Sequence, residues 1–213
     1  TENIVLRYNL AKIGHGGITC GSETAGMIRD VYAHDCVFQG TDVGLRFKTR
    51  RPRGGGGEDL YYERIRMNLE ASAIHFDMLG SSTYVGSQAT RKMQKPDEFT
   101  PVYRNVHIKD VIIENASYFL KVAGIPESPA RNVEISNVES NSKNLILIND
   151  MNGLKLKNAV LQSADNKIQI SDGRNLHFED IRFRVNGGKV LKHVDGELSE
   201  NIYFKNCKPS VQE

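Results

Sequence analysis

Apolar and polar positions alternate in a short pattern that recurs eight times along the 213 residues. Each copy reads polar, apolar, any residue, apolar, any residue and then usually Asn or Asp. Alternation with a period of two is typical of a β-strand that buries one face. The eight copies begin at Asn3, Asp30, Asp59, Asn105, Asn132, Gly153, Asn175 and Asn201.

The spacing of these copies, from 21 to 46 residues, indicates a solenoid in which each copy opens one coil. A second apolar segment follows each strand, as in Leu45 to Phe47 and Ile74 to Phe76, so each coil should contain two or three short strands. We therefore predict an all-β fold, a right-handed parallel β-helix of about eight coils spaced about 4.8 Å apart.

The domain organisation follows from the same spacing. We expect residues 1–213 to form a single parallel β-helix domain, with a long loop insertion at 79–102. The first strand opens at Asn3 without a capping segment before it, and solenoids need caps at their ends. We therefore expect an N-terminally truncated solenoid, the C-terminal part of a larger β-helix.

A polar residue closes most of the repeated strands at the sixth position of the pattern. Asn and Asp tolerate left-handed backbone geometry, so a turn explains them better than catalysis does. These residues are Asp35, Asp110, Asn137, Asn158, Asp180 and Asn206.

Composition narrows the possible partners. A formal net charge of +2 is too small to indicate nucleic-acid binding, and no apolar run is long enough to cross a membrane. Cys20, Cys36 and Cys207 are widely spaced and form no CxxC pair, so small buried hydrophobic residues are the preferred interpretation. We predict no metal site and no cofactor.

Candidate chemistry lies in the first three coils. His15 stands between Gly14 and Gly16, and small neighbours leave an imidazole accessible, although a lone His is usually structural. Arg46 and Lys48 alternate with apolar residues, so both should point to one face and suit a carboxylate. Without the His, a solvated strand face would be the preferred explanation of the two cations.

These segments resemble family 28 of the glycoside hydrolases, the polygalacturonase family, and within it a bacterial branch that includes exo-acting enzymes. The similarity is specific in residues 2–70 and weaker beyond. It is carried by Asn3-Ile4-Val5, Gly14-His15-Gly16, Gly21-Ser22-Glu23, Asp35-Cys36, Gly40-Thr41-Asp42 and the run from Gly44 to Arg51.

The resemblance implies inverting hydrolysis of α-1,4 bonds between galacturonic acid units in pectin. The family's catalytic acids lie in an Asn-Thr-Asp motif and an Asp-Asp pair, and neither motif occurs in these 213 residues. We expect this portion alone to be inactive, its partners to be pectin or a galacturonate oligosaccharide and the missing N-terminal coils, and the complete protein to be periplasmic or extracellular. The alternative is a non-catalytic β-helix that binds carbohydrate or serves as a structural module.

The resemblance also suggests roles for individual residues. His15 would share the proton network of the missing acids, Arg46 and Lys48 would hold substrate carboxylates, and Gly16 would let the sugar approach closely. Glu23 would add a polar contact. Tyr84, in the long loop, could stack on a sugar ring or have no such role.

Three arginines flank the glycine run that follows the Arg-Phe-Lys segment. Arg50, Arg51 and Arg53 could extend an anion-binding site, but the glycines favour a mobile loop that these residues keep soluble.

Overall fold

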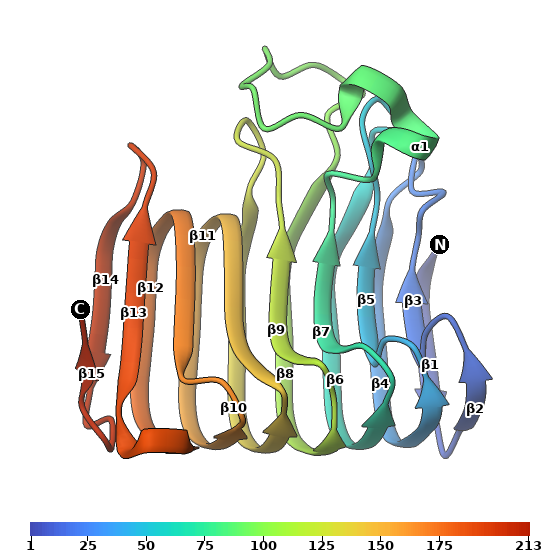
Figure 1. Cartoon of the computed structure of the whole chain (residues 1–213). Coiled ribbons are helices and arrows are strands. Elements are labelled where there is room, and N and C mark those ends of the chain that lie inside the picture. Colours follow the sequence, from blue (N-terminus) through green and yellow to red (C-terminus); the bar gives the residue numbers. More distant parts are fainter.

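The computed structural model describes residues 1–213 and is a stack of parallel strands curled around one axis (Figure 1). The all-β parallel β-helix predicted from the repeats is confirmed. The strands are β1 (Glu2–Arg7), β2 (Leu10–Gly14), β3 (Ile18–Cys20), β4 (Ile28–Thr41), β5 (Leu45–Lys48), β6 (Gly56–Leu69), β7 (Ser72–Asp77), β8 (Val102–Asn115), β9 (Tyr118–Ala123), β10 (Ala130–Ser142), β11 (Asn144–Ser163), β12 (Lys167–Val185), β13 (Val190–Asp195), β14 (Glu200–Lys205) and β15 (Val211–Gln212). The short helices are α1 (Ser82–Val85), η1 (Gly86–Gln88) and η2 (Asn186–Gly188).

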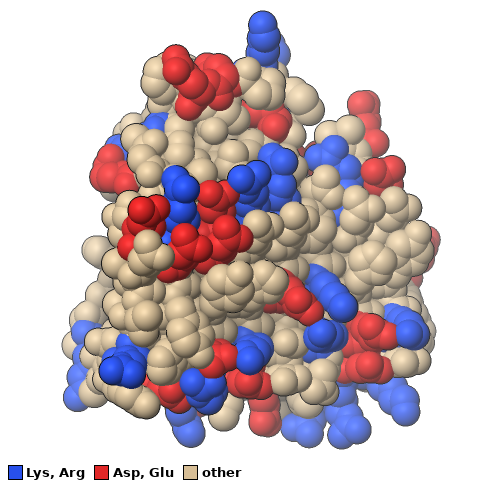
Figure 2. All heavy atoms as spheres, turned by 180° about the vertical axis from the view of Figure 1, so that it is seen from behind, with Lys and Arg blue, Asp and Glu red and all other residues tan.

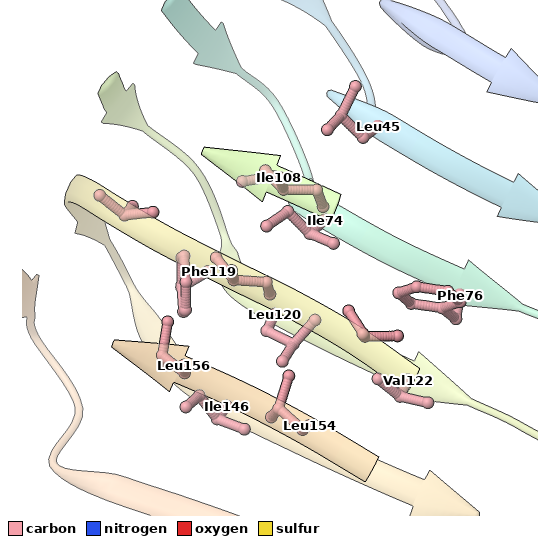
Figure 3. Close-up of a cluster of buried hydrophobic side chains, with 14 of the residues drawn as sticks. Leu45, Ile74, Phe76, Ile108, Phe119, Leu120, Val122, Ile146, Leu154 and Leu156 are labelled. Carbon is pink, nitrogen blue, oxygen red and sulfur yellow. The ribbon is translucent and has the colours of Figure 1, made fainter. Parts of the chain in front are cut away.

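The register of the strands matches the repeat found in the sequence. Ile4 pairs with Val31, and the same repeat position continues through every coil to Ile202. Between the two end coils these side chains belong to one apolar core of 45 buried residues, and Ile4 and Ile202 are partly buried and pack against it. Figure 3 shows part of that core, with Leu45, Ile74 and Phe76 facing the same interior as Leu154 and Leu156. Stacking aligned aliphatic positions therefore builds a continuous core along the solenoid.

Polar residues turn the chain at both ends of the repeated strand. Asp35 and Asn137, at the sixth position, have φ angles of 53° and 55°, as the turn interpretation predicts. The first position is left-handed too, because Asn105 and Asn132 have φ angles of 56° and 54°. Side-chain amides link successive turns into ladders: Nδ2 of Asn137 donates to Oδ1 of Asp110 at 2.8 Å. The periodic Asn and Asp residues therefore stabilise the turns.

One outer side of the stack presents charges that neutralise each other between coils. Glu63 on β6 lies 2.8 Å from Nζ of Lys109 on β8, and Glu179 on β12 lies 2.6 Å from Nζ of Lys205 on β14. Figure 2, seen from behind, shows acidic and basic side chains close together in bands. Such pairing leaves little net charge for an external ligand.

The opposite side carries the short strands β3, β5, β7 and β9, which lie next to one another in the front of Figure 1. The same set continues through the first parts of β11 and β12 to β13. Residues 78–101 connect β7 to β8 and include α1 and η1; this loop projects above the strands. It occupies the region of the insertion expected at 79–102.

Candidate functional site

The two cations predicted to share a face do so on β5. Leu45 and Phe47 are fully buried, and Arg46 and Lys48 alternate with them and remain partly exposed. Two outward rows cross the neighbouring strands at these positions. The Arg46 row consists of Thr19, Arg46, His75, Lys121, Leu147, Gln169 and His193. The Lys48 row consists of Lys48, Asp77, Ala123, Asn149, Ser171 and Asp195.

Arg46 is held in place by a carboxylate on the next strand. Its Nη2 atom donates to Oδ2 of Asp77 at 2.6 Å, and both side chains are about four-fifths buried. Its Nε atom is buried and has no hydrogen-bond partner within the protein. The guanidinium is held on one side by Asp77, and about one-fifth of the side chain stays exposed to an external acceptor.

His75 lies next to Arg46 and is neutral over most of the pH range. Burial lowers its pKa from 6.5 to about 4; Asp77 opposes this, whereas Lys121 and Arg46 add to it. Its Nδ1 atom is buried without a partner. With His75 neutral, Arg46, Lys48 and Lys121 outnumber the single anion Asp77. We call these five residues the cationic face; its uncompensated charge suits a carboxylate ligand.

His15 lies on the turn between β2 and β3, next to the cationic face rather than on it. Gly14 is in register with Thr41, and Thr19 is in register with Arg46, so His15 precedes the Arg46 row by four residues. Its side chain is 94% exposed, and Nδ1 lies 2.8 Å from Oδ2 of Asp42. The structure therefore brings Arg46 and Lys48 together and places His15 on the turn that precedes β3, the strand next to them.

The glycines beside His15 have packing roles within the chain. A Cβ atom on Gly16 would overlap Oγ1 of Thr19, and one on Gly17 would overlap the ring of Phe38. A side chain at either position would therefore displace a neighbour. The close approach of a sugar to Gly16 stays a prediction.

Glu23 and Tyr84 have partners outside the cationic face. Glu23 is exposed and forms an ion pair with Arg53. Tyr84 belongs to α1 and is 77% exposed, with the guanidinium of Arg50 5.8 Å from its ring centre. Their proposed contacts with substrate stay predictions.

The expectation that Arg51 keeps a mobile loop soluble is wrong. Its Nε and Nη2 atoms donate to the two carboxylate oxygens of Glu127 at 2.5 and 2.6 Å, and both side chains are almost fully buried. Nη1 also donates to the carbonyl of Thr90 at 2.6 Å. Arg51 therefore ties the insertion loop to the β-helix.

The glycine run after Arg51 is packed rather than free. The amide of Gly54 donates to the carbonyl of Phe99 at 2.8 Å, and the amide of Gly56 donates to that of Thr24 at 3.1 Å. Gly55 has a φ angle of 59°, and a Cβ atom there would overlap the Thr24 carbonyl. These glycines allow the backbones to come into close contact. In the sequence alone, the same glycines suggested a mobile loop.

Sequence reasoning missed His75 and Asp77 as members of the site. The signal was present, because the segment Ile74 to Phe76 aligns with Leu45 to Phe47 in the repeat. Extending that alignment by one residue places Asp77 beside Lys48. A motif within one coil does not reveal this face, because the face is made by stacking residues of successive coils.

The structure contains no group of three His, Cys, Asp or Glu side chains arranged to hold a metal ion. None of its helices has the length and apolar character needed to span a membrane.

Two curated proteins are similar to this chain. A probable polygalacturonase of Vitis vinifera is 36% identical over 121 residues, which are 57% of this chain and 23% of that protein. An exo-poly-alpha-D-galacturonosidase of Dickeya chrysanthemi is 36% identical over 75 residues, 35% of this chain and 12% of that protein. These partial matches are to proteins named as polygalacturonases, and they support a likeness to the glycoside hydrolase 28 family for part of the chain.

The family resemblance noted from the motifs is thus confirmed for part of the chain. The matched segments are under a quarter of the length of either polygalacturonase relative. No family model matches the chain, and no solved structure matches it.

Proposed function

We propose that this chain forms the uronate-binding part of a polygalacturonase, which hydrolyses α-1,4-galacturonosyl bonds in pectin when complete. The observation that supports this most strongly is the uncompensated charge of Arg46, Lys48 and Lys121 around a single anion, Asp77. On the other side of the solenoid, similar cations are neutralised in pairs. A polymer with one carboxylate on each sugar matches the cationic face.

Each predicted residue has a role in this proposal. Arg46, whose side chain is about one-fifth exposed, offers its guanidinium to a sugar carboxylate, and Lys48 offers its ammonium. His15, exposed and held by Asp42, serves the proton network of the catalytic acids from the neighbouring turn. Gly16 admits the sugar at that turn, and Glu23 and Tyr84 contribute at its margins.

Hydrolysis with inversion requires two carboxyl groups, one to protonate the leaving oxygen and one to activate water. The family's Asn-Thr-Asp and Asp-Asp motifs are absent from these residues. We assign the acids to coils of the complete protein outside this chain, and we expect the chain alone to be inactive. An exo mode of action and a periplasmic or extracellular location belong to the same proposal.

A second candidate function is non-catalytic carbohydrate binding, and the absence of the acid motifs favours it. The two candidate functions differ in whether the complete protein hydrolyses its ligand. Both require the cationic face to bind a uronate, but only a polygalacturonase also cleaves the polymer.

The test is release of reducing sugar from polygalacturonate by the complete protein and by residues 1–213. We expect activity for the complete protein, none for the chain alone, and strong loss in His15→Ala and Lys48→Ala variants that unfold at the unchanged temperature. An inactive complete protein that still binds polygalacturonate would support the binding module instead.

A further inference from the structure

A second hollow lies on the same side of the solenoid as the cationic face, farther along the stack. It has a volume of about 300 Å³ and is lined mainly by polar residues. The chemistry-bearing members are Arg91, Asn149, Gln169, Ser171, His193 and Asp195. We call it the amide pocket.

The amide pocket continues the two rows that form the cationic face. Gln169 and His193 belong to the Arg46 row, and Asn149, Ser171 and Asp195 belong to the Lys48 row. Gln169 is four strand spacings from Arg46, about 19 Å at 4.8 Å per strand. One side of the molecule therefore changes from cationic to amide-bearing along its length.

The one arginine of the amide pocket is neutralised within the chain. Arg91 comes from the insertion loop, and its Nε donates to the buried Asp150 at 2.7 Å. Its Nη2 donates to Asp172 at 2.6 Å, and Nη1 donates to Oγ of Ser171 at 3.2 Å. Two carboxylates face one guanidinium, and Asp195 adds a third anion nearby. Unlike the cationic face, this pocket should repel a uronate.

The remaining groups suit a sugar hydroxyl. The side-chain amides of Asn149 and Gln169 each donate and accept hydrogen bonds, as does the hydroxyl of Ser171. Sugar hydroxyls also do both, so the two sets are complementary. Leu147, which lies between Lys121 and Gln169 in the Arg46 row, adds apolar surface for the C–H face of a ring.

We propose that the amide pocket is a binding site for a neutral, hydroxyl-rich sugar unit. The pocket goes beyond the uronate site, and together the two would select a saccharide that carries a carboxylate at one place and a neutral sugar at another. Only this joint selection rests on the proposed function; binding in the pocket does not.

The test uses two probes that differ in one group, methyl galactoside and methyl galacturonoside. Each is titrated into the whole chain while NMR follows the side-chain amide signals of Asn149 and Gln169. We expect methyl galactoside to shift both signals and to bind the pocket about fivefold more tightly, since two like charges about 4 Å apart in water repel each other by about 1 kcal/mol.

Variants make the assignment specific. Asn149→Ala and Gln169→Ala should each weaken galactoside binding, whereas Gln162→Ala, on an exposed position elsewhere on β11, should not. Asp195→Asn should reduce the preference against the uronate. Lys48→Met should weaken galacturonoside binding at the cationic face and leave the galactoside shifts unchanged, which separates the two proposals.

Three results would overturn the inference. They are galactoside titration without a shift of either amide signal, equal or tighter binding of the galacturonoside in the pocket, and a shift of one amide signal that persists at full size when the other amide is replaced. Thermal unfolding of each variant at the temperature of the unsubstituted chain excludes loss of folding as the cause.

Discussion

Arg46 and Asp77 lie on neighbouring strands, and Nη2 of Arg46 donates to Oδ2 of Asp77 at 2.6 Å. Asp77 is also in register with Lys48, so one carboxylate lies on the strand next to both cations. This pairing fixes the guanidinium but cancels only part of the positive charge. The relationship is why the face can be both rigid and able to attract an anion.

Replacing Asp77 with Asn should strengthen uronate binding. The substitution removes a negative charge near the expected carboxylate; at about 6 Å in water such a charge is worth about 0.7 kcal/mol, or about threefold in affinity. Calorimetric titration with trigalacturonate at low salt measures the change. Weaker binding by Asp77→Asn would mean that holding Arg46 in place matters more than charge.

His75 should titrate far below an ordinary histidine. Burial lowers its pKa from 6.5 to about 4, with Asp77 opposing. Because the folded state disfavours the imidazolium, the contribution of neutral His75 to stability is present above pH 6.5 and declines as the pH falls towards 4. NMR of the ring protons should give a midpoint near 4, and His75→Gln should flatten the acid side of the stability profile. A midpoint near 6.5 would contradict the burial seen here.

The buried pair of Arg51 and Glu127 should matter greatly for folding. Glu127→Gln leaves the guanidinium buried beside a neutral group, which we expect to cost about 3–5 kcal/mol of unfolding free energy in urea. The matched control is Arg53→Met, whose exposed partner Glu23 makes the pair worth about 0–1 kcal/mol. Similar losses for the two variants would show that Arg51 does not anchor the insertion loop.

At Asn137 in the asparagine ladder, the effect of backbone conformation on stability can be separated from the effect of hydrogen bonding. This residue has a φ angle of 55°, donates to Asp110, and accepts from Nδ2 of Asn158 at 2.7 Å. Both Asn137→Gly and Asn137→Ala lose the ladder bonds, but only Ala bears the left-handed penalty of about 1–2 kcal/mol. The Ala variant should therefore be less stable than the Gly variant in urea unfolding. In an ordinary strand the order would be reversed.

Much of the fold could be predicted from the sequence because the solenoid repeats a single requirement. Every coil must present an aliphatic residue at the position of Ile4 and Val31. The repeat is therefore visible in the sequence, and the register of the strands follows from it. The turn residues could be predicted equally well, since Asp35 and Asn137 occupy left-handed positions that few other residue types tolerate.

The site was less predictable, since it depends on contacts between coils. Arg46 and Lys48 could be placed on one face by alternation, but the partner Asp77 is 31 residues from Arg46. Arg51 was misjudged for a related reason: Glu127 is 76 residues away, and no pattern in the sequence pairs the two residues. Local composition suggested a mobile loop where tertiary contacts make a buried anchor.

The most direct test of the uronate-binding face is calorimetric titration of residues 1–213 with trigalacturonate and with its fully methyl-esterified form, using the unsubstituted chain and Lys48→Met. The account predicts clear preference for the free acid and about a tenfold loss of affinity in Lys48→Met, as expected when one charge-assisted contact is removed. Equal affinity for acid and ester, or unchanged affinity in the variant, would contradict it.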